Sequence, residues 1–326
     1  MNEAFLNAVA ENHIRYDGKI VVLKAGGEIW DDPIKRARVL SHIHTLQMFG
    51  ARILVINGGG KQITEEYARR GLTPVFENGE RMCDKEGLKA AMDALRQVTH
   101  DIANEYNQLT RGSNRGFCAM PINGFDLRLV EARSKAPGVY TGDVAKVNSE
   151  WLQNMMNGSP HQIFIINSIC ADIDRTGGFL NVNADFVASA LAGSVNAERF
   201  LMGTTAPGIV DTRIDLVEYL RNQKRFNGAS KARLEKEADK IKFTQKDPRL
   251  LRNATYQEIE HLIAVGVIKD GMIPKTRAAL DALARGVLGS VILDSDSLLQ
   301  ELFTKKGAGT LIVRQETPQF TPGVKL

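Results

Sequence analysis

Short apolar runs alternate along the chain with longer stretches in which apolar residues recur every three or four positions. The short runs are rich in valine, isoleucine and leucine, as buried strands are, and the longer stretches have the periodicity of amphipathic helices. Strands are predicted at residues 19–23, 52–56, 116–122, 161–169, 199–204, 290–294 and 310–314, and helices at 32–50, 60–71, 85–109, 184–197, 255–266 and 274–286. Helices inserted between continuous apolar strands favour an α/β fold with a mostly parallel sheet covered on both faces.

The formal net charge of +4 over 326 residues is concentrated in one segment. Residues 221–250 hold ten Lys/Arg and four Asp/Glu, a balance of +6, so the rest of the chain carries −2. This distribution excludes a nucleic-acid-binding surface over the whole molecule. The segment interrupts the alternation of strands and helices, and we expect a solvated charged loop inserted into the fold. The alternative is that its lysines cover a nucleotide or bind an acidic partner.

Neither a membrane span nor a secretory signal is expected. No apolar run approaches the roughly 18 residues that a span needs, and residues 1–13 lack a basic region followed by a long apolar core. These residues instead predict a short amphipathic helix with Phe5, Leu6 and Val9 on one face. The three cysteines are widely spaced, which argues against a disulfide framework or a zinc site and favours a reducing cytoplasm.

Two of the predicted strands end in adjacent glycines with a lysine nearby, in KAGG (24–27) and NGGG (57–60). Ligands of parallel α/β sheets bind at the carboxyl ends of the strands, and glycine lets an anion approach backbone N–H groups closely. The pattern therefore predicts an anion site, most simply for phosphate, although each cluster alone is also consistent with a tight strand-to-helix turn. Neither cluster has the spacing of a Walker A loop or of a dinucleotide-binding GxGxxG.

Two further segments carry charged residues at predicted helix starts. Asn181, Asn183 and Asp185 alternate at one of them, where Asp185 is either part of the site or only the N-cap of the helix. Lys275 lies in the first turn of another, where a positive charge opposes the helix dipole. A local conflict of this kind is expected at functional sites.

These segments resemble, in their order, the amino acid kinase family, and within it the acetylglutamate kinase branch, over nearly the whole chain. Besides the glycine clusters, the matching segments are NGERMCD (78–84), INGFDLRLVEAR (122–133), GVYTGDVAKVNSEWL (138–152), NVNADFVASALA (181–192), APGIVD (206–211), GMIPK (271–275) and GAGTLI (307–312). The resemblance implies an αβα sandwich with an acceptor lobe at 19–196 and a nucleotide lobe at 197–326. Residues 1–18 are similar to the N-terminal helical arm of hexameric members, so a homo-oligomer, either a dimer or a hexamer, is expected.

The resemblance also implies a role for each matching residue. Lys24 and Lys275 would flank the transferring phosphoryl group, and Asp185 between them would keep the two lysines aligned. Arg81 and Asn181 would bind the far end of the acceptor. The implied phosphate cradle consists of Gly26, Gly27, Gly58 and Gly59, and the implied nucleotide contacts are Thr204, Thr205, Gly208, Gly271 and Met272.

The reaction that the resemblance implies is ATP-dependent phosphorylation of the side-chain carboxylate of N-acetyl-L-glutamate, giving an acyl phosphate in arginine biosynthesis. A carboxylate is already ionised at neutral pH, so no general base is required, and Mg²⁺ would arrive with ATP, held by phosphate oxygens and water. Asn57 stands where this branch usually has histidine, and Thr205 where it usually has aspartate. Two alternatives stay open: a kinase for another acylated or carrier-linked amino acid, such as an aminoadipate derivative, and a weakly catalytic amino-acid-sensing homologue.

Overall fold

The computed structural model describes residues 15–314 except 78, 114 and 305. The amphipathic helix predicted at the N-terminus lies almost entirely outside these residues. Within the described part of the chain, no helix is both long enough and apolar enough to cross a membrane.

Eight of the described strands form one central sheet with β1 near its middle. Neighbouring strands run parallel except β13 and β14, which pair antiparallel. The prediction of a mostly parallel sheet is therefore confirmed. From one edge to the other, the strands are β12 (Asn253–Thr255), β14 (Thr310–Val313), β13 (Ser290–Asp294), β11 (Arg199–Thr204), β1 (Ile20–Ala25), β2 (Arg52–Asn57), β8 (Gln162–Asn167) and β5 (Cys118–Asn123).

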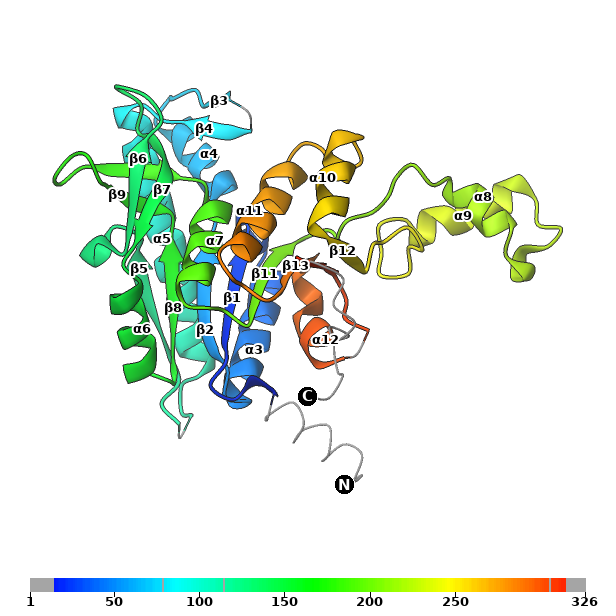
Figure 1. Cartoon of the computed structure of the whole chain (residues 1–326), viewed down its shortest axis with the longest axis horizontal. Coiled ribbons are helices and arrows are strands. Elements are labelled where there is room, and N and C mark those ends of the chain that lie inside the picture. The colour runs from blue at the N-terminus through cyan, green and yellow to red at the C-terminus, as the bar shows by residue number, and fades with distance from the viewer. Residues whose placement is uncertain (1–14, 78, 114, 305, 315–326) are drawn as a thin grey trace.

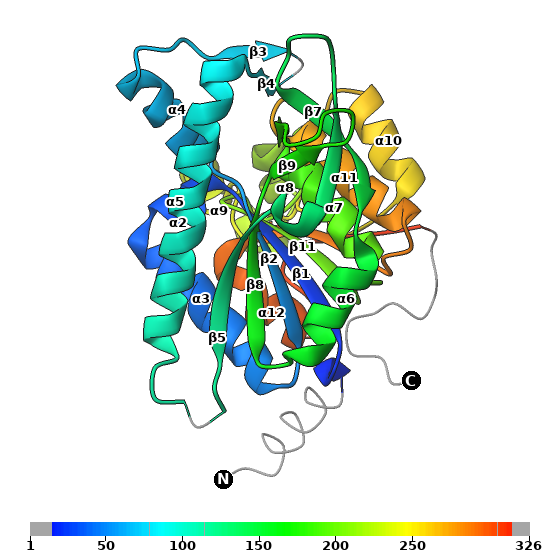
Figure 2. The same ribbon diagram turned by 90° about the vertical axis from the view of Figure 1, so that its left-hand side faces the viewer.

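Helices cover both faces of this sheet, as an αβα sandwich requires (Figure 1). Alternating strand residues supply the two cores: Leu23 and Val55 pack on one face, and Val22 and Ile56 on the other. Figure 2 shows the two layers of helices on either side of the strands. The first face is covered by α3 (Pro33–Met48), α5 (Lys85–Leu109) and α12 (Leu298–Phe303), and the second by α6 (Ser149–Gly158), α7 (Ala184–Ser194), α10 (Tyr256–Ala264) and α11 (Met272–Ala284).

Residue 197, the expected boundary between two lobes, also divides the strands of the central sheet, while the two lobes themselves stay a prediction. Every central strand that precedes this residue lies on the β1 side of the β1–β11 pairing, and every later one on the β11 side. That pairing is continuous and parallel, with Lys24 opposite Met202. Both halves therefore belong to one sheet, and the carboxyl ends of β1 and β2 share one edge of it.

The strand predicted at 161–169 is in fact two strands. The Asn167 side chain accepts the Ile169 N–H at 3.2 Å, which turns the chain after β8 and starts β9. The strands β6, β7, β9 and β10 then close into a small sheet of their own. A separate hairpin, β3–β4, lies above it in Figure 1. The bounds are β3 (Val75–Glu77), β4 (Glu80–Met82), β6 (Val130–Ser134), β7 (Thr141–Val147), β9 (Ile169–Asp172) and β10 (Phe179–Val182).

The basic segment is a helical projection and not the charged loop that its composition suggested. It contains α8 (Leu216–Arg221), a 3₁₀ turn and α9 (Lys231–Ile241), and so begins before the predicted start at 221. Leu220, Phe226 and Leu234 are buried in a small core of its own. Figure 1 shows α8 and α9 extending away from the sheet.

Polar contacts fix the base of this projection. Val210 and Leu250 form an antiparallel bridge, so the segment leaves the body and returns at one point. Asp247 and Arg249 form a buried ion pair at 2.9 Å beside that bridge. The projection is therefore an ordered helical insertion that is anchored to the body at one point.

Candidate active site

The two glycine clusters lie side by side at the carboxyl ends of neighbouring strands. Ala25, the last residue of β1, is in register with Asn57, the last residue of β2. The Gly58 N–H donates to the Ala25 carbonyl at 2.9 Å, which joins the loops that follow. Each loop leads directly into a helix, α2 (Gly27–Asp31) or α4 (Gly60–Arg69). Backbone N–H groups at both helix starts therefore gather at one edge of the sheet.

Close packing between the two loops explains why glycine is needed there. A Cβ on Gly27 would stand 3.3 Å from the Gly59 Cα and from the Gly60 N. The Gln62 Nε2 donates to the Gly27 carbonyl at 3.0 Å and so ties α4 to the first loop. Gln62 was not predicted from the sequence, because the GKQIT segment is indistinguishable from any polar helix start.

Lys24 and Asp185 form a buried ion pair beside these loops. Lys24 Nζ lies 2.7 Å from Asp185 Oδ1, and the side chains are only 7% and 6% exposed. A Cβ on Gly58 would stand 3.5 Å from Lys24 Cε, so the lysine also borders the second loop. Burial alone would raise the pKa of the Asp185 carboxyl, but the charges of Lys24 and Lys275 outweigh it and hold that pKa below its ordinary value.

The start of α7 determines where Asp185 points. Asn183 is the N-cap, and its Oδ1 accepts the Asp185 N–H at 2.9 Å. The simpler prediction that Asp185 caps this helix is therefore wrong. Because Asn183 is the N-cap, the Asp185 carboxylate in the first turn is free to point toward Lys24.

Lys275 reaches the same region from α11, which begins at Met272. Its Nζ donates to the carbonyl of Gly271, the residue before the helix, at 3.3 Å. Among the described residues it has no ion pair, and it is partly exposed. Its charge nevertheless lowers the pKa of Asp185, so the two groups lie within electrostatic reach. The structure thus joins Lys24 to Asp185 directly and brings Lys275 near them.

Arg81 lies in a pocket formed by α4 and the β3–β4 hairpin. Its guanidinium carbon is 4.8 Å from the ring centroids of both Tyr67 and Phe76. Nη2 donates to Thr64 Oγ1 at 2.7 Å and to the Gly60 carbonyl at 3.2 Å, while Nη1 has no partner among the described residues. Burial lowers the pKa of this guanidinium, which nonetheless stays charged at neutral pH.

The aromatic neighbours of Arg81 were not predicted from the sequence. Phe76 pairs with Arg81 across the β3–β4 hairpin, and the Asn-Gly dipeptide at 78–79 is a hairpin signal that could have related the two residues. Tyr67 is 14 residues before Arg81 on another element, and no signal in the sequence relates it to Arg81. The stacked guanidinium is held in place, and its buried Nη1 has no partner among the described residues, which leaves one donor for a carboxylate.

Asn181 lies close to Asp185 along the chain, on the strand that leads into α7. Its Cα is opposite Thr141 of β7 and Ile169 of β9, and the residue is 7% exposed. The small sheet therefore holds Asn181 in a fixed position only four residues before the ion pair.

Of the predicted nucleotide contacts, Thr204 is the last residue of β11, and Thr205 and Gly208 follow that strand. Thr204 is buried and its Oγ1 accepts the Ala206 N–H at 2.7 Å, whereas Thr205 is exposed. Gly208 has a φ of +146°, and a Cβ there would stand 2.7 Å from Thr310 Oγ1. Packing on Thr310 thus accounts for this glycine without a ligand.

A cleft of about 390 Å³ borders the site. It lies between the β3–β4 hairpin and the start of α11, and Phe186 and Pro274, the neighbours of Asp185 and Lys275 in sequence, contribute to its wall. It is lined by Glu77, Glu80, Met82, Lys135, Ala136, Phe186, Ile273, Pro274 and Arg277.

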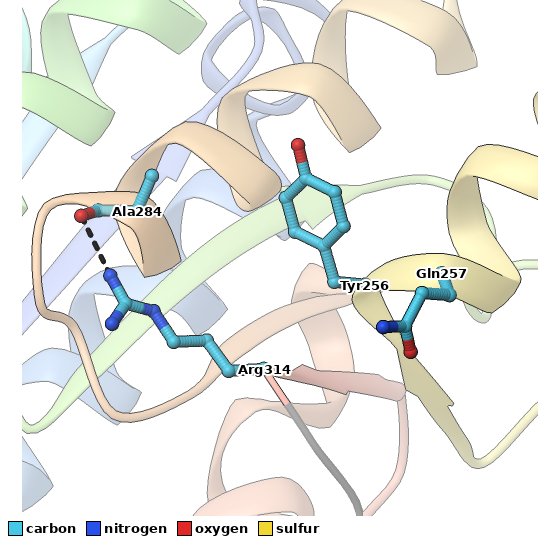
Figure 3. Close-up of a pocket in the computed structure, with 4 residues that line it drawn as sticks. All are labelled: Tyr256, Gln257, Ala284 and Arg314. Atoms are coloured by element: carbon cyan, nitrogen blue, oxygen red, sulfur yellow. Dashed lines mark hydrogen bonds between the residues drawn. The ribbon is translucent and has the colours of Figure 1, made fainter.

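A second cavity, of about 520 Å³, lies at the opposite edge of the sheet and is lined by Tyr256, Gln257, Ala284 and Arg314 (Figure 3). Tyr256 and Arg314 follow strands that run antiparallel to β1, so both stand at the amino ends of the parallel strands. The Arg314 guanidinium donates to the Ala284 carbonyl at 2.7 Å across this cavity. Because none of the predicted site residues lines it, we place the candidate active site at the glycine loops.

Comparison with known proteins bears on the identity of this site. Residues 19–227 match the model of the amino acid kinase family. The chain is 30% identical over 304 residues to an acetylglutamate kinase of Prochlorococcus marinus subsp. pastoris, covering 91% of this chain and 93% of that protein. It is 31% identical over 304 residues to an acetylglutamate kinase of Synechococcus sp., covering 92% and 85%.

Solved structures share the fold at lower identity. N-acetylglutamate synthase from Neisseria gonorrhoeae, complexed with coenzyme A and N-acetyl-glutamate, has a TM-score of 0.72 at 20% identity over 96% of this chain and 64% of that one. Carbamate kinase from Giardia lamblia bound to AMP-PNP has a TM-score of 0.62 at 13% identity, over 91% and 99%. With the αβα sandwich and the match of residues 19–227, these findings show that the chain belongs to the amino acid kinase family.

Proposed function

We propose that the protein transfers the γ-phosphoryl group of ATP to the side-chain carboxylate of N-acetyl-L-glutamate, a step of arginine biosynthesis. Two sequence relatives that match most of this chain are named acetylglutamate kinase. The observation that carries the proposal is the buried Lys24–Asp185 ion pair at 2.7 Å, which borders two adjoining glycine loops. Such a site combines a fixed positive charge with backbone donors, as phosphoryl transfer requires.

The chemical step needs charge and positioning more than acid–base catalysis. A carboxylate oxygen of the acceptor attacks the γ-phosphorus, the bond to the β,γ-bridging oxygen breaks, and ADP leaves with that electron pair. The acceptor is already ionised at neutral pH, so no proton has to be removed. Lys24 and Lys275 would offset the negative charge that builds up as the anions approach, and Asp185 would hold the lysines in line.

The remaining groups would bind the two substrates. Amides of Gly26, Gly27, Gly58 and Gly59 would cradle the transferring phosphoryl oxygens. Arg81, with its unpaired Nη1, would bind the α-carboxylate of the acceptor, and Asn181 would bind near it. Thr204, Thr205 and Gly208, at and after the end of β11, and Gly271 and Met272, at the start of α11, would lie along the nucleotide.

Mg²⁺ belongs to this proposal as a companion of ATP. Among the described residues no group of three or more His, Cys, Asp or Glu side chains is placed to hold a metal ion. The one carboxylate at the centre of the site, Asp185, is already paired with Lys24. The ion would therefore be carried by phosphate oxygens and water, and would supply positive charge to the leaving ADP.

The experiment that tests this function is a hydroxylamine trap for the acyl phosphate, run with ATP and a panel of acceptors. The panel holds N-acetyl-L-glutamate, free glutamate, free aspartate, N-acetylated aminoadipate and longer N-acyl glutamates. We expect the highest kcat/KM with N-acetyl-L-glutamate. A higher value with another acylated acid would transfer the proposal to that substrate, and no hydroxamate with any acceptor would favour a sensing homologue.

Assembly forms the last part of the proposal. We infer a cytoplasmic homo-oligomer, a dimer or a hexamer, from the resemblance of residues 1–18 to the arm of hexameric members. Light scattering of the full chain and of a chain lacking these residues tests it, since the mass should fall when the arm is removed. An unchanged mass would exclude the arm from the assembly.

A further inference from the structure

Three asparagines stand in register at the carboxyl ends of adjacent strands. Asn57 of β2 is opposite Asn167 of β8, which is opposite Asn123 of β5. Asn57 and Asn167 are completely buried. Asn167 Nδ2 donates to Asn123 Oδ1 at 2.9 Å, so the amides form a polar row under the edge where the glycine loops lie.

Thr99 of α5 connects this row to the helix that packs beneath it. Its Oγ1 accepts from Asn167 Nδ2 at 3.2 Å and lies 3.1 Å from Asn57 Oδ1. The same hydroxyl is 2.6 Å from the Leu95 carbonyl one turn earlier. Thr99 is 1% exposed, so none of these contacts is shared with bulk solvent.

The Asn57 amide cannot be fully satisfied in this arrangement. Its Nδ2 has no partner among the described residues. A rotated amide would donate Nδ2 to Thr99 Oγ1 and free the single hydroxyl proton for Leu95, but it would leave Oδ1 unpaired instead. A fully buried amide with one unpaired atom is costly, so a site with only a packing role would favour an apolar side chain.

The location of Asn57 suggests a role for this buried amide. Asn57 directly precedes the second glycine loop, and α5 touches that loop from below: a Cβ on Gly59 would stand 2.7 Å from Leu95 Cδ2. Leu95 and Thr99 thus contact the loop and the residue before it from one helix face. Any shift of Asn57 against Thr99 would move the Gly58–Gly60 backbone relative to Lys24.

We propose that Asn57, Thr99 and Asn167 form a positioning group that fixes the distance between the backbone of the second glycine loop and α5. The inference rests on the proposed function, because the loop matters to turnover only if it cradles a phosphoryl group. The three side chains act through the loop backbone and do not touch the reacting atoms. Their loss should therefore lower kcat and leave the KM of the acceptor, which is bound elsewhere, nearly unchanged.

The test is a double-mutant cycle on the full chain with Asn57→Leu, Thr99→Val and the two combined. Thr99→Val alone leaves the buried Asn57 amide without any partner and should lower the melting temperature. The combined variant replaces both partners by apolar groups of similar size and should recover that melting temperature. Its kcat should nevertheless stay about 10- to 100-fold below the wild-type value.

A matched control comes from the same helix. Thr110, the C-cap residue of α5, is also buried and its Oγ1 also lies near the carbonyl four residues earlier, at 3.0 Å from Tyr106 O, but it is remote from the loops. Thr110→Val should lower the melting temperature and leave kcat unchanged. A second readout needs no substrate: amide hydrogen exchange in residues 54–62 should be faster in the combined variant and normal in Thr110→Val.

The outcomes separate this inference from the proposed function. Normal kcat and normal exchange in a stable combined variant would overturn the positioning role. If amide exchange is faster in the combined variant but the wild type phosphorylates none of the acceptors, the positioning role stands and the proposed function is overturned. Low kcat with an unchanged acceptor KM, together with faster exchange, would support both.

Discussion

Lys24 and Asp185 are 161 positions apart in sequence, yet their charged atoms lie 2.7 Å from each other in a site that is almost closed to water. The pair joins the end of β1 to the first turn of α7. A buried ion pair is rarely retained for stability alone, because desolvation of both charges offsets much of their attraction. Its position beside two phosphate-type loops instead suggests a role in turnover.

Removing either lysine should act mainly on the chemical step. Lys24→Ala and Lys275→Ala should each lower kcat by two to four orders of magnitude, about 3–5 kcal/mol, because both charges act in the transition state. Asp185→Asn, which keeps the shape and removes the aligning charge, should also act mainly on kcat. Hydroxamate formation and melting should be measured on each variant. Near-normal trapping by a folded Lys275→Ala protein would remove Lys275 from the mechanism.

Asp185 also predicts how stability depends on pH. The pKa of Asp185 is lowered in the folded state, so the ionised carboxylate stabilises the fold. This stabilisation is complete at pH values above the pKa of aspartate in the unfolded chain, about 3.9, and is lost as the pH falls through the pKa of Asp185 in the folded protein. The gap in unfolding free energy between wild type and Asp185→Asn should therefore be largest near neutral pH and shrink below about pH 4. Denaturant titrations at several pH values measure it, with a substitution of the exposed Asp101 as control. A gap independent of pH would contradict this assignment.

Arg81 should affect binding of the acceptor more than its turnover. Arg81→Lys keeps the charge but loses the planar guanidinium that stacks between Tyr67 and Phe76, so the acceptor KM should rise by about tenfold or more. The KM for ATP should change little. Arg70→Lys is a matched control, since Arg70, the C-cap residue of α4, pairs with Glu66 of α4 and Asp93 of α5. Equal effects of the two substitutions would argue against a specific role.

The contact between the glycine loops can be tested with one methyl group. Gly27→Ala would bring a Cβ to 2.4 Å from Gln62 Oε1 and to 3.3 Å from the Gly59 Cα. It should displace the Gln62 side chain that ties α4 to the first loop and separate the loops, lowering kcat/KM by about 10- to 100-fold. A Cβ on Gly60 meets nothing within 4 Å, so Gly60→Ala should melt like the wild type. Steady-state kinetics and melting on both variants decide the matter. Unchanged kinetics for Gly27→Ala would show that the loops tolerate separation.

The helical projection should be dispensable for folding of the body. Because Val210 and Leu250 pair at its root and its core is separate, residues 216–241 can be replaced by a short Gly-Ser linker that leaves the buried Asp247–Arg249 ion pair in place. The melting temperature of the body and the KM for ATP should both stay close to wild type, since the projection extends away from the sheet (Figure 1). A raised KM for ATP would revive the hypothesis that its lysines reach the nucleotide.

The sequence by itself determined the local elements and the chemistry of the site. Apolar periodicity located seven of the eight strands of the central sheet and six of the described helices, because the spacing of apolar side chains shows which face is buried. It missed the three-residue strand β12, the β3–β4 hairpin and most of the small sheet. The glycine clusters indicated an anion site, since only glycine permits close backbone approach, and their order with Asp185 and Lys275 resembled one family. Composition failed for residues 221–250. Phe226 and Leu234 are too few and too widely spaced to outweigh the charges there, and yet they form a small core together with Leu216 and Leu220, which precede the segment.

Only the tertiary structure decided which distant groups meet. Strand order placed β1 between β2 and β11, and this brought Lys24 to both glycine loops and to α7. Asn183 took the cap that Asp185 could equally have filled, a choice between two residues that local propensity does not distinguish. The stacking of Arg81 and the contact of Asn57 with Thr99 likewise depend on how α4 and α5 pack beneath the loops. Such contacts arise from the packing of whole elements, and no local pattern in the sequence encodes them.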